Sequence, residues 1–211
     1  MTSINLLTIF DKERPTRGKG LLEGFLAYKR AEMANKLIEN KCRNGKILDI
    51  GCGSHPLFLL KTNFKNKFGI DKHELNEYEE FFKQNNIIFN VYDLEKDVAI
   101  PYEDNSFEIV TMLAVFEHIE PEKLDGVINE IHRILKQDGS FILTTPAKWT
   151  HNILKLMTWL KLVSKVEFLE HKDLYNHEKI SKILIKNGFL KNKILKGFFE
   201  SFMNLWLLAK K

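Results

Sequence analysis

The 211-residue chain has few cysteines and no long apolar run. Its two cysteines, Cys42 and Cys52, form neither a disulfide framework nor a paired metal-binding spacing, which indicates a reducing compartment. No uncharged apolar run approaches the roughly 18 residues that span a bilayer. The first 19 residues lack the order of charge, apolar core and small cleavage residues of a signal peptide. These absences predict a cytoplasmic protein.

Charge of one sign is not concentrated anywhere in the chain. The formal net charge is +4, and the lysines and arginines are spread along the sequence, so nucleic acid is not implied as a partner. The acids and histidines show no clustered metal-ligand spacing, so we expect no metal site. The 44% apolar and 28% charged content is ordinary for a globular protein, and the length predicts one domain with a full core.

The most informative stretch is a short apolar segment that ends in an acid and two glycines, residues 46–53. Asp49 lies near its end, and Gly51 and Gly53 can take positive φ and let a ligand lie against the main chain. A second apolar run, residues 67–70, ends at Asp71, which is placed to accept hydrogen bonds from both ribose hydroxyls. These features predict an adenosine-containing cofactor on an α/β sheet.

Two common phosphate-binding motifs are missing. Ser54, His55 and Pro56 follow Gly53, so the third glycine of the dinucleotide fingerprint is absent. The chain also has no Gly-Lys-Ser/Thr triplet of a Walker loop. We therefore predict an adenosine ligand without a phosphate chain. Pro56 further predicts that the helix after the first strand starts late or is short.

This pattern resembles the class I S-adenosylmethionine-dependent methyltransferases, of the type 11-like kind, whose first motif is an acid followed by Gly-x-Gly. Later segments follow the same family order from about Gly45 to Pro146: Asn90–Leu94, Ile100–Val110 and Leu113–Ile119. The resemblance implies S-adenosylmethionine as cofactor. It also implies a Rossmann-like sheet of seven strands, mostly parallel with an antiparallel last strand, and helices on both faces.

The resemblance assigns cofactor roles to residues at the strand ends. Asp71 would hold the ribose, Asp93 and Leu94 the adenine, and Gly51, Gly53 and Ala114 the amino-acid half. The whole implied set is Asp49, Gly51, Cys52, Gly53, Asp71, Lys72, Asp93, Leu94, Ala114 and His118.

Outside the core, periodicity predicts further elements of the same single domain, 1–211. We expect an N-terminal helical cap (1–44, with a helix over 21–40), a cofactor-binding core (45–146), a substrate lid insert (147–175), and a last helix with a closing β-hairpin (176–211). Within these parts, we predict helices over 73–85, 124–135 and 176–186, with Asn176 as an N-cap. A turn is expected over 136–140, and strands over 141–146, 189–199 and 202–209.

The predicted lid is the most individual segment. Residues 149–163 place apolar residues at helical spacing between lysines, and the stretch is similar to the apolar insert of ubiquinone-biosynthesis O-methyltransferases. Two interpretations stay open: a lid packed on its own domain, or a lid that also makes weak peripheral membrane contact through residues 149–165. The acceptor is then a small molecule or a lipid-linked molecule, methylated at oxygen. A hydroxyl acceptor needs a nearby proton acceptor, for which the candidates are His118, His151 and His171.

Two rival functions remain beside methyl transfer. One is a catalytically silent adaptor with this fold, which would show a broken first motif or lack the ribose acid. The other is an NAD-dependent oxidoreductase, which Pro56 and the closing hairpin disfavour. The sequence predicts neither an oligomeric state nor the identity of the acceptor.

Overall fold

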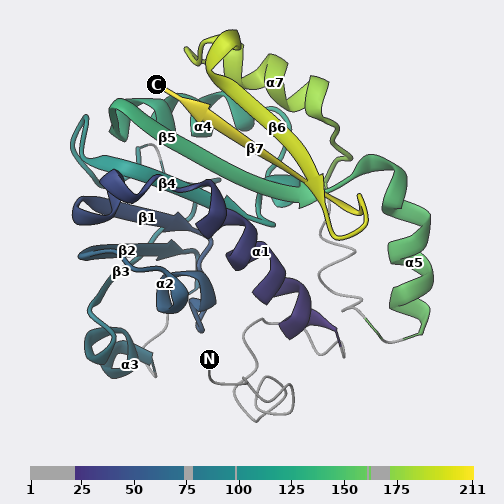
Figure 1. Cartoon of the computed structure of the whole chain (residues 1–211), viewed down its shortest axis with the longest axis horizontal. Helices are drawn as coiled ribbons and strands as arrows, with labels where there is room; N and C mark the ends of the chain where they lie inside the picture. The colour runs from purple at the N-terminus through teal and green to yellow at the C-terminus, as the bar shows by residue number, and fades with distance from the viewer. Residues whose placement is uncertain (1–21, 74–77, 98, 161, 163–171) are drawn as a thin grey trace.

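The structure, a computed structural model, describes residues 22–73, 78–97, 99–160, 162 and 172–211. Its centre is a seven-stranded sheet in the order β3-β2-β1-β4-β5-β7-β6 (Figure 1). β1 to β5 pair in parallel, whereas β7 runs antiparallel to both β5 and β6. The strands are β1 (Lys46–Ile50), β2 (Asn66–Asp71), β3 (Ile87–Val91), β4 (Phe107–Leu113), β5 (Leu135–Pro146), β6 (Ile194–Phe199) and β7 (Asn204–Lys210). The predicted sheet is confirmed.

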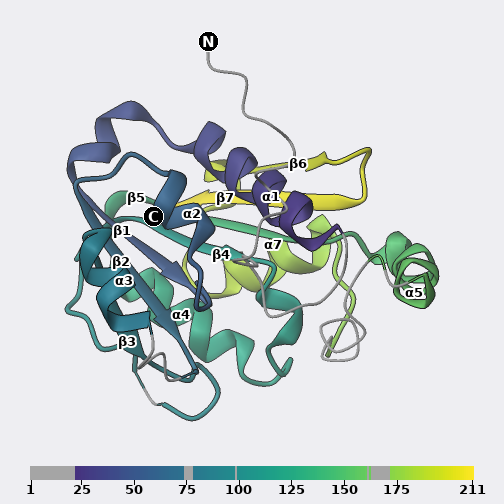
Figure 2. The ribbon, with the colours of Figure 1, turned by 90° about the horizontal axis from the view of Figure 1, so that it is seen from below.

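Helices cover both faces of the sheet. Figure 2 shows α1 and α2 on one side and α4 and α7 on the other. The helices are α1 (Glu23–Leu37), α2 (Leu57–Lys61), α3 (Glu79–Gln84), α4 (Leu124–Ile134), α5 (His151–Trp159) and α7 (His177–Lys186). α5 stands apart from both layers, beyond the end of β5 (Figure 1).

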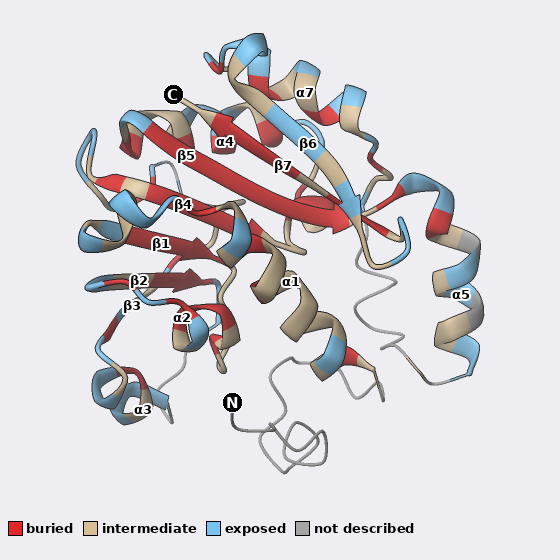
Figure 3. Ribbon diagram, viewed as in Figure 1, coloured by how far each residue is buried: buried red, intermediate tan, exposed pale blue. Residues whose placement is uncertain are grey.

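Strand residues alternate between the two helical layers, as the pleat requires. Ile47 of β1 and Ile109 of β4 pack in a core with α1, α2 and α3. Their neighbours Leu48 and Val110 pack in the larger core with α4 and α7. The central strands are therefore buried on both faces (Figure 3), which explains why they read as continuous apolar runs in the sequence.

Several local predictions are confirmed. α2 has only five residues and follows Pro56, as that proline predicted. The side chain of Asn176 accepts a hydrogen bond from the Lys179 backbone N–H at 2.8 Å and caps α7. α1 ends at Leu37 rather than at residue 40, because residues 40–44 form a 3-10 turn instead.

The expected turn over residues 136–140 lies inside β5, so this prediction is wrong. β5 starts at Leu135 opposite Phe107, and its next partner is Ser140 opposite Ile109, so the extra residues form a bulge. Asp138 takes φ 62°, and a Cβ on Gly139 would lie 2.8 Å from the Lys136 carbonyl oxygen. Polar residues and a glycine predicted a turn, but these residues lie within β5, and its pairing with β4 resumes at Ser140.

The predicted strand 189–199 starts later, at Ile194. Phe189 instead packs in the core against His132, with ring centroids 5.1 Å apart, and residues 191–193 form a 3-10 turn. The last strand starts at Asn204 because Glu200, Ser201 and Phe202 all have positive φ in the hairpin turn. The closing hairpin exists, but both of its strands are shorter than the apolar pattern suggested.

We predict that Leu143→Ala lowers the free energy of unfolding by about 2–5 kcal/mol, because Leu143 is fully buried in β5 and the change leaves a cavity. The matched control is Leu195→Ala on the edge strand β6, where the side chain is exposed and the change should stay within about 0.5 kcal/mol. Urea denaturation followed by circular dichroism measures both. Equal losses in the two variants would contradict this assignment of the core.

Candidate functional site

The chain leaves β1 through a turn made of Gly51, Cys52 and Gly53. The backbone N–H groups of Gly51 and Cys52 both donate to the Ile70 carbonyl oxygen, at 2.8 and 3.3 Å. Gly51 and Gly53 have φ of 73° and 68°, a region that glycine enters without cost. A Cβ on Gly51 would lie 2.4 Å from a methyl carbon of Val115, whereas a Cβ on Gly53 would meet no atom within 4 Å. Gly51 is thus required by packing, and Gly53 borders open space at the main chain.

Asp71 holds this turn from the end of the neighbouring strand β2. Its Oδ2 accepts a hydrogen bond from the Gly53 N–H at 3.0 Å, and its Oδ1 accepts one from the His73 N–H at 3.1 Å. The residue is buried. Because a carboxylate offers about four lone-pair sites, both oxygens can accept further hydrogen bonds from a ligand. The predicted ribose acid therefore lies directly beside the open space at Gly53.

Asp49 is the second buried acid at this edge of the sheet. Its Oδ1 accepts a hydrogen bond from the Thr111 hydroxyl at 2.6 Å. The pKa of the Asp49 carboxyl is raised to about 7, chiefly by burial and also by the charge of Asp71, while the Thr111 hydrogen bond acts in the opposite direction. Burial also raises the pKa of the nearby Cys52 thiol.

Asp93 follows β3, and its carboxylate contacts residues of the turn that comes directly after it. One carboxylate oxygen accepts from the Glu95 N–H at 3.0 Å, and the other pairs with Lys96 at 3.1 Å. Burial by itself raises the pKa of Asp93, but these two contacts and the charges of Lys96 and Lys72 bring it below the usual value. Lys72 itself is exposed. Leu94 is half-buried against the larger core.

Ala114 and His118 lie in the turn after β4. Ala114 has φ 56°, and its N–H donates to the Thr144 carbonyl oxygen at 2.9 Å. His118 ends a short 3-10 helix, residues 116–118, and its N–H donates to the Val115 carbonyl oxygen. His151 begins α5 after β5, and His171 lies outside the described residues. His118 and His151 therefore follow two adjacent strands at the same edge of the sheet.

Glu117 is a candidate that the sequence analysis missed, because the resemblance drew attention to the neighbouring histidine. Its side chain is only 2% exposed, and its Oε2 has no hydrogen-bond partner among the described residues. The Tyr175 hydroxyl is also buried and has no hydrogen-bond partner among the described residues. The Tyr175 ring packs edge-on against Phe116, with ring centroids 4.8 Å apart. Burial, then the charges of Asp173 and Glu117, raise the pKa of Tyr175. A buried carboxyl group in the turn after β4 can accept a hydrogen bond from a bound molecule.

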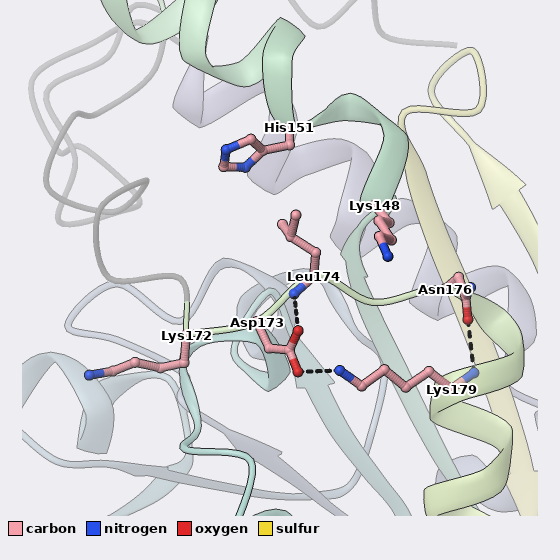
Figure 4. Close-up of a pocket in the computed structure, with 7 residues that line it drawn as sticks. All are labelled: Lys148, His151, Lys172, Asp173, Leu174, Asn176 and Lys179. Carbon is pink, nitrogen blue, oxygen red and sulfur yellow. Dashed lines mark hydrogen bonds and ion pairs between the residues drawn. The ribbon is translucent and has the colours of Figure 1, made fainter.

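A pocket of about 360 Å³ lies beside these turns (Figure 4). No sequence motif marks it, since its residues come from two separate stretches, 148–151 and 172–179. They are Lys148, His151, Lys172, Asp173, Leu174, Asn176 and Lys179.

Among the described residues, no group of three or more histidines, cysteines or acids could hold a metal ion. In the same part of the chain, no helix is long and apolar enough to cross a membrane.

A family model described as a methyltransferase domain matches residues 22–191. An uncharacterized protein of Methanocaldococcus jannaschii is 32% identical over 124 residues, which cover 58% of this chain and 50% of that protein. The uncharacterized methyltransferase YcgJ of Bacillus subtilis is 30% identical, covering 49% of this chain and 42% of its own. A tRNA N(3)-cytidine methyltransferase of Bos taurus is 28% identical, covering 46% and 29%. The chain thus spans half or less of the length of these relatives.

Solved structures share the whole fold. A protein of Pyrococcus horikoshii superposes with a TM-score of 0.69 at 18% identity, covering 97% of this chain and 98% of that one. A methyltransferase of Archaeoglobus fulgidus, described as S-adenosylmethionine-dependent, superposes with a TM-score of 0.66 at 18% identity, covering 98% and 100%. At these identities the likeness concerns the fold.

The raised pKa of Asp49 predicts a pH-dependent stability. Because the folded value of about 7 lies above the ordinary 3.8, the native state binds the proton more tightly than the unfolded chain does. This group therefore makes the protein less stable as the pH rises from about 4 to about 7, by at most about 4 kcal/mol. Asp49→Asn should remove that loss, so the variant should gain stability over the parent at pH 8 but not at pH 4.

Urea denaturation at both pH values measures the difference between variant and parent. Asp138→Asn is the control, since this carboxylate is exposed and asparagine tolerates its positive φ. An Asp49→Asn difference that does not grow between pH 4 and pH 8 would show that the carboxyl is ionised normally in the fold.

Proposed function

The chain belongs to the methyltransferase domain family, its cofactor is S-adenosylmethionine, and we propose that it transfers the methyl group to a small-molecule or lipid-linked acceptor, at an oxygen atom. One observation supports this most directly. The open space at Gly53 lies beside a buried carboxylate, Asp71, and a carboxylate is the acceptor that ribose hydroxyls require. An adenosine ligand fits that combination of bare backbone and acceptor.

We assign the cofactor contacts to the ends of four strands. The turn Gly51–Gly53 would lie along the amino-acid half, together with Ala114 after β4. Asp71 would accept the ribose hydroxyls, and Leu94 would contact the adenine. Asp93 would contact the adenine beside Leu94, and the Glu95 N–H and Lys96 hold its two oxygens in place. Asp49, Cys52, Lys72 and His118 surround these groups. We further propose the single-domain division given by the sequence, with 45–146 as the cofactor-binding core.

The chemistry asked of the protein is chiefly positioning. Bound S-adenosylmethionine supplies an activated methyl group, and holding an acceptor in line with it can account for about 7–11 kcal/mol of a barrier. A hydroxyl acceptor must also lose its proton, for which His118 and His151 follow β4 and β5 at the same edge. The buried carboxylate of Glu117 is a further acceptor there. His171 stays a proposal made from the sequence alone.

The exposure of α5 supports an acceptor-facing lid rather than a helix packed into the core. Ile153 is 38% exposed, Leu160 50% and Trp159 78%, although all three are large and apolar. Trp149, just before the helix, is exposed as well. An apolar surface of this kind suits contact with a greasy acceptor or with the edge of a lipid layer.

A second acceptor class, RNA, is favoured by one observation, the tRNA methyltransferase among the relatives. The even spread of lysines and arginines argues against it. The experiment for the proposed function therefore follows the label from methyl-labelled S-adenosylmethionine into cell extract that is separated into lipid, aqueous small-molecule and macromolecular fractions. Label in the small-molecule or lipid fraction supports the proposal, and label in RNA replaces it with the second class.

We predict that Gly53→Val abolishes binding of S-adenosylhomocysteine, because the valine side chain fills the space at the main chain. Asp71→Ala should weaken binding by about 1.5–3 kcal/mol, as expected for lost hydrogen bonds to a charged group. Gly126→Val is the control for Gly53→Val, since its Cβ would also meet no atom but lies on α4. Calorimetry measures affinity, and circular dichroism checks folding. Binding retained by a folded Gly53→Val variant would show that the cofactor lies elsewhere.

We predict that the double substitution Ile153→Ser and Leu160→Ser reduces methyl transfer by about tenfold or more through loss of acceptor positioning, while cofactor affinity stays unchanged. The fold should be kept, because both side chains are exposed. Leu195→Ser, exposed on β6, is the matched control. Flotation of the parent protein with anionic vesicles at low salt tests the membrane contact separately. Full activity of the double variant would contradict a role of this segment in positioning the acceptor. Unfolding of the variant would show that the apolar side chains of this segment belong to the core.

A further inference from the structure

The pocket beside the candidate site is lined by more positive than negative charge. Three lysines and a single acid, Asp173, are among the residues that line it (Figure 4). Its volume of about 360 Å³ is in the range of small-molecule sites. Charged side chains gathered in a concave site of this size raise the local concentration of ligands of opposite sign.

The walls of the pocket are fixed by backbone contacts. The Lys148 N–H donates to the Tyr175 carbonyl oxygen at 2.9 Å, and Ala147 pairs with Tyr175 as an isolated parallel bridge. Tyr175 is buried, so the segment that holds Asp173 and Asn176 is anchored against the end of β5. The lysines therefore extend from a defined backbone frame.

The single acid is already neutralised. Asp173 pairs with Lys179 and accepts a hydrogen bond from the Leu174 N–H at 2.7 Å. Burial raises the pKa of Asp173, but these two contacts and the charge of Lys148 lower it overall, so the carboxyl stays ionised and paired. Asp173 and Lys179 together contribute no net charge to a ligand.

The remaining positive charge lies mainly at Lys148. Lys172 pairs with Glu120 at 2.7 Å, on the side away from Asp173. Lys148 is exposed, and among the described residues it forms no ion pair. It also lies just before α5, and the positive end of that helix adds to its field. An anion entering the pocket would thus find an ammonium group with its hydrogen-bond donors available.

The pocket lies next to the turns that follow β4 and β5. The Lys172 N–H donates to the Glu117 carbonyl oxygen at 2.8 Å, and Glu117 precedes His118 after β4. His151, which lines the pocket, follows β5. A molecule held here by one end can reach the turns to which we assign the cofactor.

We propose that this pocket binds the anionic group, a phosphate or a carboxylate, of the methyl acceptor, with Lys148 as its principal contact. This inference rests on the proposed function of the same site and specifies its substrate class. Lysine ammonium groups bind phosphate and carboxylate as point charges with several donors.

Binding of inorganic phosphate to the protein saturated with S-adenosylhomocysteine tests the site directly. Backbone amide resonances of Lys148, His151 and Leu174 should shift saturably in nuclear magnetic resonance spectra. Lys148→Ala should weaken phosphate binding about tenfold, as expected for loss of a charge-assisted hydrogen bond. Lys182→Ala, an exposed lysine of α7 that pairs with Glu178 outside the pocket, should leave it unchanged. Absence of saturable shifts, or equal weakening by both variants, would overturn the proposal.

The label experiment identifies the source of the anion. The labelled product should be retained by an anion exchanger, and phosphatase treatment should release it if the group is a phosphate monoester. Extraction into organic solvent separates a lipid headgroup from a free small molecule. A labelled product that is neutral or cationic overturns the inference while methyl transfer stands. If the parent protein does not bind S-adenosylhomocysteine at all, the proposed function itself is refuted.

Discussion

The hydrogen bond between the Asp71 carboxylate and the Gly53 N–H is the contact on which the candidate site depends. It joins the turn after β1 to the end of β2, and the Gly51 and Cys52 N–H groups reinforce the joint by donating to Ile70. Gly51 cannot carry a side chain, because Val115 occupies the place of its Cβ. The turn is therefore fixed by packing on one side and by a charged acceptor on the other, while Gly53 keeps an open face.

A second consequence of this arrangement is electrostatic. Asp49 and Asp71 end adjacent strands, and both are buried. Asp71 accepts two backbone N–H groups, whereas Asp49 accepts the Thr111 hydroxyl. Burial and the nearby charge of Asp71 raise the pKa of Asp49, so protonation of Asp49 relieves the repulsion between the two carboxyl groups. A cationic ligand near this edge would favour the ionised form, so the site gives up some stability of the empty fold for affinity.

The proposed acceptor pocket is built differently from the proposed cofactor site at the ends of β1 and β2. Its parts come from the end of β5, the segment before α7 and the turn after β4, and backbone hydrogen bonds from Lys148 to Tyr175 and from Lys172 to Glu117 join them. Around this frame the ion pairs Asp173–Lys179 and Lys172–Glu120 use up most of the charges. What remains to recognise an acceptor is the ammonium of Lys148, which forms no ion pair with the described residues, and the exposed apolar side of α5. A site with a charged group at one end and an apolar surface at the other is complementary to an amphipathic acceptor.

The sequence by itself determined the sheet, the glycine turn and the buried acids Asp49 and Asp71. These follow from local rules: apolar runs form buried strands, glycines allow positive φ, and parallel strands bring their carboxyl ends to one edge. Pro56 and Asn176 likewise set the start of their helices by their own chemistry. The tertiary structure alone decided that residues 136–140 form a bulge, because pairing with β4 overrides turn preference, and that Phe189 packs in the core before β6 begins. It also decided the burial of Glu117 and the gathering of three lysines in one pocket, because contacts between distant segments leave no periodic or motif signal in the chain.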